Sequence, residues 1–131
     1  MYLLDTNVCI FLINKRPVNV LDRLQEALNQ GITISSITVA ELQFGVYNSQ
    51  YKEKNRIALT EFLAPFGIID FDDSDAETYG KIRAYLKTRG IIIGPYNMLI
   101  AAQAITKDLV LITNNTDEFT RIPDLKLEDW K

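Results

Sequence analysis

Several features that would narrow the class of this protein are scarce or missing from its 131 residues. Its single cysteine, Cys9, has no partner for an intramolecular disulfide. No stretch approaches the roughly 20 apolar residues that a membrane-spanning helix needs. The first five residues lack the basic start and the long apolar segment of a secretory signal. We therefore expect a soluble protein of the cytoplasm that does not enter a membrane.

An excess of positive charge is also missing. The chain has 14 Lys and Arg against 17 Asp and Glu, a formal net charge of -3. Because nonspecific nucleic-acid binders usually carry a broad basic surface, composition alone argues weakly against an RNA ligand. That argument loses force if acidic side chains converge on bound cations, since metals cancel carboxylate charge and attract phosphate. The positions of the acids therefore decide the question.

The length and the hydrophobic fraction of 47% fit one globular domain, residues 1–131. Apolar runs predict four strands, at residues 2–4, 32–34, 68–71 and 109–112. Helical spacing predicts six helices, at residues 8–13, 18–29, 38–48, 52–66, 74–89 and 96–106. This alternation predicts an α/β fold, with a mostly parallel sheet covered by helices on both faces.

Two capping boxes are expected to open helices. In the first, Thr38 is the N-cap and Glu41 the third helical residue. Ser74 and Glu77 form the second, in a helix that Gly90 closes. Both boxes would fix where a helix leaves the sheet.

Polar side chains follow the predicted strands at the edge where α/β sheets bind ligands. Asp5 ends the first strand, and Glu41 lies one turn into the helix after the second. Asn97 begins the helix before the fourth strand, and Asn115 follows that strand. Mg²⁺ prefers oxygen ligands and often takes only one or two carboxylates from the protein. Asp5 and Glu41 could supply that minimum.

Each of these residues also has an ordinary structural explanation. Asp5 can form a turn at a strand end, and Glu41 can serve the capping box. Asn97 can satisfy amides of a first helical turn, and Asn115 suits a loop. From the residues alone both interpretations stay open, and the structural one is favoured.

Four segments in order resemble the VapC family of PIN-domain toxins. They are MYLLDTN at 1–7, SSITVAELQFG at 35–45, GPYNMLIAA at 94–102 and TNNTDEF at 113–119. The likeness spans nearly the whole chain and ends with LEDW at 127–130. One such segment would be a weak signal, but four at the right separations make a chance match very improbable.

The resemblance implies a PIN-like three-layer fold, with a parallel sheet of about five strands and the first strand in the centre. It also implies an endoribonuclease that uses Mg²⁺ or Mn²⁺ to activate a water for in-line attack on phosphorus. The expected partners are a VapB-type antitoxin and a second copy of the chain, with DNA contacted only through the antitoxin. A transfer RNA is the first expected substrate, ahead of ribosomal or messenger RNA.

By position, the resemblance makes Asp5 and Glu41 the first two acids of the metal site. Asn97 stands where the family has an aspartate. An amide keeps the shape but is a poorer ligand for a hard cation, so metal affinity and turnover should fall. Deliberate inactivation is favoured over natural loss as the origin of this asparagine.

Asn115 falls where many PIN domains have a fourth acid, and Asp117 could supply the missing charge. Whether the site holds one metal or two stays open. Supporting roles are expected for Thr6, Asn7 and Thr113.

The sequence gives weaker evidence for where RNA would bind than for the metal site. Candidate phosphate contacts are Lys81, Arg83, Lys87 and Arg89 on one predicted helix, with Lys15 and Arg16 elsewhere, although a solvated helix face explains them more simply. Tyr96 is the expected base-stacking residue. The phenylalanines on apolar helical faces are expected in the core; they are Phe11, Phe44, Phe62 and Phe66.

Two other functional classes deserve comparison. A noncatalytic module could bind the antitoxin without cutting RNA, and Asn97 makes this a serious alternative. A receiver-like phosphoacceptor domain would need paired acids at the first strand and a lysine near the last, and neither stands where required. An apolar groove beside an acidic pocket would suit a partner that inserts an arginine or a lysine.

Overall fold

The structure, a computed structural model, describes residues 1–15 and 18–130, in which strands and helices alternate. The strands are β1 (Tyr2–Leu4), β2 (Ile32–Ser35), β3 (Gly67–Ile69), β4 (Val110–Ile112) and β5 (Leu127–Glu128). The helices are α1 (Thr6–Ile13), α2 (Val18–Ala27), the 3₁₀ turn η1 (Leu28–Gln30), α3 (Ser36–Tyr47), α4 (Lys52–Leu63), α5 (Asp73–Thr88), α6 (Pro95–Thr106) and α7 (Thr116–Phe119). No helix in this described part is long and apolar enough to cross a membrane.

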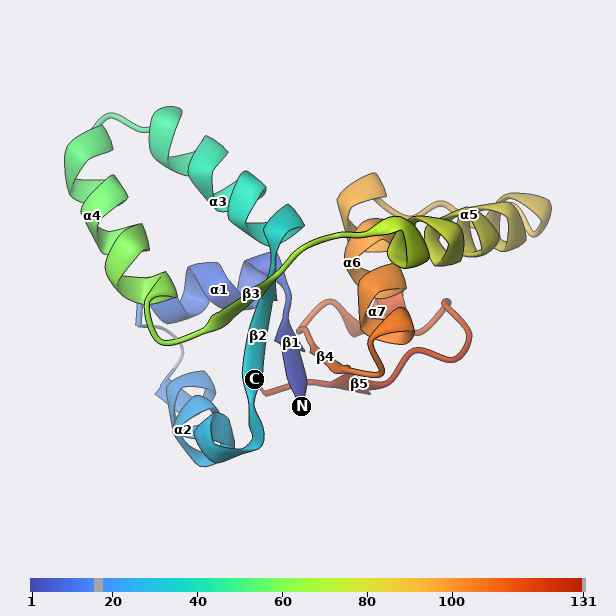
Figure 1. Cartoon of the computed structure of the whole chain (residues 1–131), viewed down its shortest axis with the longest axis horizontal. Helices are drawn as coiled ribbons and strands as arrows, with labels where there is room; N and C mark the ends of the chain where they lie inside the picture. Colours follow the sequence, from blue (N-terminus) through green and yellow to red (C-terminus); the bar gives the residue numbers. More distant parts are fainter. Residues whose placement is uncertain (16–17, 131) are drawn as a thin grey trace.

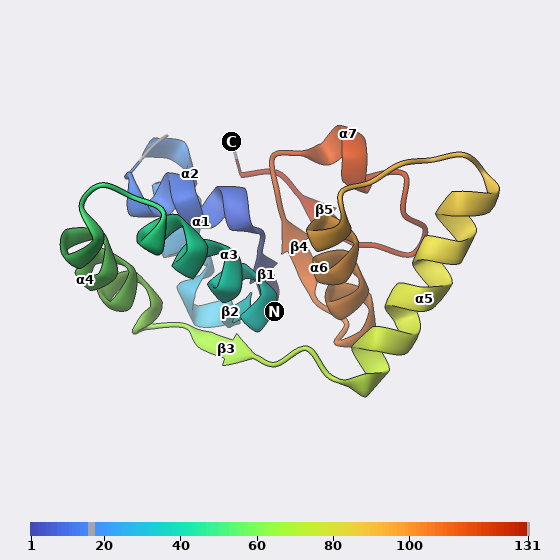
Figure 2. The same cartoon turned by 90° about the horizontal axis from the view of Figure 1, so that it is seen from above.

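The five strands form one sheet in the order β3-β2-β1-β4-β5, with every neighbouring pair parallel. The first strand is central, as the resemblance implied (Figure 1). Successive residues of a strand point to opposite faces, so Leu3 packs in one core cluster and Leu4 in the other. Helices α1 to α4 lie on one side of the sheet, and α5 and α6 lie on the other (Figure 2). The predicted three-layer α/β fold is confirmed.

The first predicted capping box is wrong. Helix α3 begins two residues before the expected N-cap, and its N-cap is Ser35, whose Oγ accepts a hydrogen bond from the backbone N–H of Ile37 at 3.0 Å. Serine caps helices at least as well as threonine, and β2 leads directly into the helix here. Thr38 is therefore buried inside the helix, and Glu41 has no capping duty.

The second predicted capping box is displaced by two residues. Asp72 is the N-cap, and its Oδ1 accepts from Asp75 N at 3.0 Å, while Asp75 Oδ2 accepts from Asp72 N at 2.9 Å. Aspartate is as good an N-cap as serine, and the buried Asp75 also approaches Lys107. This extra ion pair explains why the helix starts here rather than at Ser74.

The remaining differences lie at element ends. Helix α1 begins at Thr6 rather than at residue 8, because the Asp5 side chain caps it. Helix α4 ends at Leu63, three residues earlier than predicted. The short elements α7 and β5 have too few residues for a periodic pattern to reveal them.

Candidate metal centre

Asp5 is fixed at the turn from β1 into α1, at the centre of the sheet's carboxyl edge. Its side chain is only 2% exposed. Oδ1 accepts a hydrogen bond from Val8 N at 2.8 Å, and Oδ2 accepts from Thr113 Oγ1 at 2.5 Å. Burial raises the pKa of Asp5 and the nearby Glu41 charge adds to this, while the hydrogen bonds from Thr113 and Val8 oppose it. The ionised form of Asp5 is therefore costly in this environment.

Thr113 connects Asp5 to the loop after β4. It is fully buried, and its Oγ1 also accepts a hydrogen bond from Asn115 N at 3.0 Å. This hydroxyl fixes one carboxylate oxygen of Asp5, while a supporting role of Thr113 in the function stays a prediction.

Glu41 approaches Asp5 from helix α3. Its Oε1 accepts a hydrogen bond from Thr6 Oγ1 at 2.6 Å, and that hydroxyl also lies 3.2 Å from Thr38 Oγ1. The carboxylate is partly exposed and lines the same hollow as Asp5. Glu41 is thus oriented by the Thr6 side chain at the start of α1 rather than by its own helix terminus.

Asn97 is held by Glu118, an acid that the sequence interpretation missed. Asn97 Nδ2 donates to Glu118 Oε1 at 3.1 Å, Asn115 Nδ2 donates to Oε2 at 2.9 Å, and Gly94 N donates to Oε1 at 2.8 Å. Burial opposes ionisation of Glu118, but these three hydrogen bonds outweigh it and lower its pKa. Glu118 is therefore an ionised group beside Asn97.

Asp117, predicted as a possible source of the missing charge, does not take that place. It is solvent-exposed, and in the described part of the chain the acid contacting Asn97 and Asn115 is its neighbour Glu118. The sequence contained an indication of this role for Glu118, because Asn115 is the N-cap of α7 and Glu118 is the third residue of that helix. A glutamate at that position commonly points back towards the helix start.

The predicted residues meet around one hollow of about 260 Å³. Its lining consists of Asp5, Thr6, Asn7, Glu41, Gly94, Pro95, Tyr96 and Asn97. Asn115 does not line it and acts instead through Glu118. We call this hollow the acid pocket.

The donors of the acid pocket suit a hard divalent cation. Carboxylate and amide oxygens are the ligands that Mg²⁺ and Mn²⁺ prefer. Within residues 1–15 and 18–130, no lysine or arginine forms an ion pair with Asp5 or Glu41. The same residues contain no group of three or more His, Cys, Asp or Glu side chains placed to hold a metal. Asn97 leaves the set one acid short.

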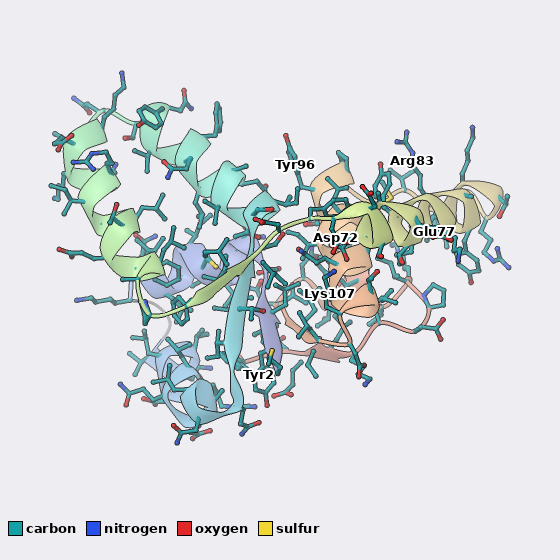
Figure 3. The ribbon with its side chains drawn as sticks, in the orientation of Figure 1. Tyr2, Asp72, Glu77, Arg83, Tyr96 and Lys107 are labelled. Atoms are coloured by element: carbon teal, nitrogen blue, oxygen red, sulfur yellow. The ribbon has the colours of Figure 1, made fainter. Side chains whose placement is uncertain are left out.

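The predicted RNA contacts divide into two places. Tyr96 lines the acid pocket, while Arg83 and Lys87 line a separate hollow of about 430 Å³ at the end of α5. Tyr96 and Arg83 point to the same side of the molecule (Figure 3). Lys81 forms an exposed ion pair with Glu77 at 3.4 Å. Lys15 and Arg89 are exposed, and Arg16 lies outside the described residues.

Phe44 was predicted in the core, and that prediction is wrong. Its side chain is 69% exposed, and it lines a second hollow together with Tyr96. Phe62 and Phe66 are half-buried against the core and each other, with ring centroids 5.2 Å apart, and Phe11 is half-buried. Because α3 is apolar over much of its surface, the sequence could not show whether the Phe44 ring lies in the core or at the surface.

Comparison with known proteins gives a consistent result. The PIN domain family model matches residues 2–125. The chain is 47% identical over 131 residues to ribonuclease VapC2 of Rickettsia felis, covering 99% of this chain and 98% of that protein. It is 41% identical over 130 residues to the tRNA(fMet)-specific endonuclease VapC of Shigella flexneri, covering 98% of this chain and 97% of that protein.

Solved structures agree with the sequence relatives. VapBC2 from Rickettsia felis, bound to a DNA fragment from its promoter, matches with a TM-score of 0.95 and 44% identity, covering 99% of this chain and 98% of that one. DNA-bound VapBC from Salmonella typhimurium matches with a TM-score of 0.94 and 38% identity over the same shares. The fold, the order of the acidic residues and these relatives agree: the chain belongs to the PIN-domain family of VapC ribonuclease toxins from VapBC toxin–antitoxin systems.

Proposed function

We propose that this chain is an endoribonuclease that requires Mg²⁺ or Mn²⁺, and that Asn97 weakens it. The observation that carries the proposal is the buried, fixed Asp5 facing Glu41, with no lysine or arginine of residues 1–15 and 18–130 paired to either. Bringing two carboxylates together without a counter-charge costs free energy, which a bound divalent cation would offset. The hollow beside them leaves space for a phosphate.

The chain's own residues would hold and orient the reacting groups. Asp5 and Glu41 would ligate the cation, with Asn97 as a weak third ligand, and Thr113 and Thr6 keep the two carboxylates in position. When bound, such a cation lowers the pKa of a water and offsets charge on the phosphate. Tyr96 and Asn7, at the rim of the acid pocket, would border the RNA.

Asn97 explains why activity would be reduced in this chain. Its Nδ2 is engaged with Glu118, so only a neutral oxygen remains for a cation. An aspartate at this position would face Glu118 across about the same 3.1 Å, and the repulsion would favour cation binding. The substitution Asn97→Asp should therefore raise both metal affinity and turnover.

We propose a transfer RNA as the substrate, because one relative is named a tRNA(fMet)-specific endonuclease. Recognition of an RNA loop by shape and unpaired bases leaves little trace in sequence motifs. The basic side chains of α5, Arg83 and Lys87 among them, would contact the RNA backbone beyond the acid pocket.

A VapB-type antitoxin is the proposed protein partner, since the matched solved structures are VapBC complexes. A groove of about 280 Å³ between α1, α3 and α4 is mostly apolar but has Glu41 in its lining; its apolar residues include Ile10, Ile13, Leu42, Val46 and Leu59. An apolar segment carrying an arginine or lysine could fill this groove and pair with Glu41, blocking metal and substrate together. DNA would be contacted only through the antitoxin. We also propose that two copies of this chain form a homodimer.

RNA cleavage tests the nuclease proposal. We would compare the chain, Asn97→Asp and the double variant Asp5→Asn/Asn97→Asp on purified transfer RNA, with Mn²⁺ and with chelator. We expect the single variant to cut at least about 100-fold faster than the double variant, since even residues that merely orient metal ligands contribute roughly 10–100-fold. Chelator should abolish the cutting.

The noncatalytic antitoxin-binding module remains the second candidate, because Asn97 removes a ligand charge. If all versions fold and bind antitoxin but none cuts transfer, ribosomal or messenger RNA, that candidate replaces the nuclease proposal.

A further inference from the structure

Two exposed aromatic rings stand at the edge of the acid pocket. Phe44 is 69% exposed on α3, and Tyr96 is 55% exposed in the first turn of α6. Together with Ala40 and Glu41 they line a hollow of about 400 Å³, which we call the aromatic hollow. A volume in this range fits small ligands, which typically occupy roughly 300–1,000 Å³.

The two rings belong to the same region as the proposed chemistry. Phe44 follows Glu41 by three residues, so both lie on one face of α3. Tyr96 precedes Asn97 and lines both the acid pocket and the aromatic hollow, as does Glu41. A group held between the rings would thus be continuous with a group bound at the carboxylates.

The rings do not cover one another. The ring pairs in contact within the described part of the chain are Tyr2 with Trp130 and Phe62 with Phe66. Ala40, with its small side chain, contributes to the lining of the hollow. With 69% and 55% of their surface exposed, Phe44 and Tyr96 are both accessible to a ligand.

We propose that Phe44 and Tyr96 hold an unpaired nucleobase of the RNA next to the phosphate that is cut. This inference rests on the proposed nuclease function and adds to it a selectivity for single-stranded RNA. Aromatic rings stack on any base, and duplex RNA buries its bases, so only an unpaired loop or end can enter. Glu41, at the junction, could accept a hydrogen bond from an exocyclic amino group.

The low positive charge of the chain supports this role. A net charge of -3 leaves little electrostatic attraction for RNA. Stacking does not depend on counter-ion release, so it can provide affinity where basic residues are few. Loss of a ring should therefore weaken binding by a similar factor at low and moderate salt, whereas loss of Arg83 should matter less as salt rises.

Binding of a short, mixed-sequence single-stranded RNA, with 2′-O-methyl groups that prevent cleavage, tests the inference by fluorescence anisotropy. We expect Phe44→Leu and Tyr96→Leu each to weaken binding about fivefold or more, as base stacking predicts. Phe44→Tyr and Tyr96→Phe should restore it. Tyr47→Leu, which removes a ring that is 62% exposed on the same helix, is the matched control and should change nothing.

Three results would overturn the inference. One is unchanged RNA affinity in both leucine variants, and another is an equal loss in the Tyr47→Leu control. The third is weaker self-association or antitoxin binding in the leucine variants while RNA affinity stays constant, which would assign the hollow to a protein partner.

The outcome is separable from that of the nuclease proposal because binding needs no cutting. If no version cuts RNA but the rings still govern binding, the base site stands and the nuclease proposal fails. In the Asn97→Asp background, an active enzyme should show a ring variant's loss mainly in KM, whereas a structural disturbance would lower kcat and thermal stability.

Discussion

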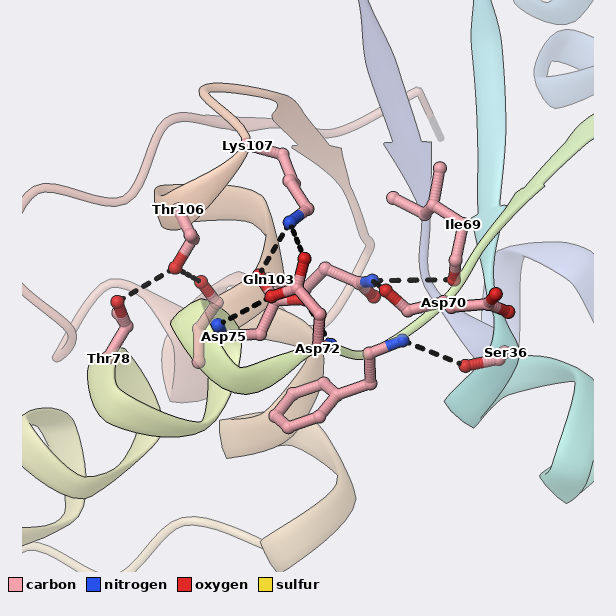
Figure 4. Close-up of polar contacts among 11 residues, drawn as sticks. Ser36, Ile69, Asp70, Asp72, Asp75, Thr78, Gln103, Thr106 and Lys107 are labelled. Carbon is pink, nitrogen blue, oxygen red and sulfur yellow. Dashed lines mark hydrogen bonds and ion pairs between the residues drawn. The ribbon is translucent and has the colours of Figure 1, made fainter.

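Two clusters of acidic side chains among the described residues differ in whether a lysine or arginine is paired with them. At the start of α5, Asp72 and the fully buried Asp75 face Lys107, the C-cap of α6, whose Nζ lies 3.5 Å from Asp75 Oδ1 (Figure 4). At the carboxyl edge of the sheet, Asp5 faces Glu41 without a lysine or arginine partner among the described residues. The acids at the start of α5 therefore have a positive charge beside them, whereas Asp5 and Glu41 have no such partner among the described residues.

The pKa directions follow this difference. The hydrogen bond from Lys107 lowers the pKa of Asp72, and the same bond raises the pKa of Lys107. Burial instead raises the pKa of Asp5. Charge that is balanced within the chain stabilises the fold, while unbalanced charge at an open hollow is available for a cation from solution.

Asp72, Asp75 and Lys107, which we call the balanced cluster, also have a structural role. Gln103 Nε2 of α6 donates to the backbone carbonyl of Asp70 at 3.0 Å, and Thr106 Oγ1 donates to Thr78 Oγ1 at 2.8 Å (Figure 4). With the Lys107 ion pairs, these contacts join the segment after β3 and helix α5 to α6. Since α6 carries Asn97, the cluster helps to position the acid pocket.

Among substitutions around the acid pocket, the largest expected effect concerns Glu118, which contacts Asn97. In the Asn97→Asp background, Glu118→Gln should reduce RNA cleavage by about 10–100-fold, because it removes the negative charge that repels the introduced carboxylate and so favours cation binding. Asp117→Asn removes the neighbouring charge and should leave cleavage unchanged. Equal losses in the two variants would show that only net charge matters and would remove Glu118 from the site.

The next prediction compares stability between the clusters. Asp75→Asn should lower the free energy of unfolding by about 1–3 kcal/mol, because it removes the ion pair with Lys107 and weakens the capping box. Asp5→Asn removes an unbalanced buried charge, and its amide can keep the Val8 cap, so stability should change by less than about 1 kcal/mol. Urea unfolding without metal measures both, and a larger loss for Asp5→Asn would contradict the comparison.

The smallest effect is in the pH dependence of stability. The pKa of Asp5 is raised by burial from its ordinary value of 3.8, so its contribution to stability is present in acid and is lost as pH rises through the folded pKa. The stability of Asp5→Asn relative to the parent chain should therefore increase as pH rises above about 4. The lowered pKa of Asp72 has the opposite sign, so the cost of Asp72→Asn should be present at pH 7 and vanish in acid. Unfolding free energies across pH would contradict this account if both variants showed the same trend.

The sequence predicts the fold well where its signals are long. Apolar strands next to helices of ten or more residues fix the α/β class, and the family resemblance supplies the order of the sheet. The two capping boxes failed because several good N-cap residues stand close together at each start, and tertiary contacts of Glu41 and Asp75 decide between them.

The site could be predicted only in part. Asp5 and Glu41 follow strands, so topology brings them together without knowledge of side chains. Glu118 lies on a helix of four residues, too short for periodicity to show which of Asp117 and Glu118 points inward, so only its position three residues after the N-cap Asn115 indicated it. Phe44 was misplaced because an exposed ring on an apolar helix cannot be distinguished from a core ring before the packing is known.

Calorimetric titration with Mn²⁺ tests most directly whether the unbalanced acids form a metal site. We would compare the chain with Asn97→Asp, Asp5→Asn and, as the matched control from the balanced cluster, Asp72→Asn. The account predicts weak binding by the chain, tighter binding by Asn97→Asp, none by Asp5→Asn, and no change in Asp72→Asn. Equal affinity in Asp5→Asn and the parent chain would contradict it, because the cation would then bind elsewhere.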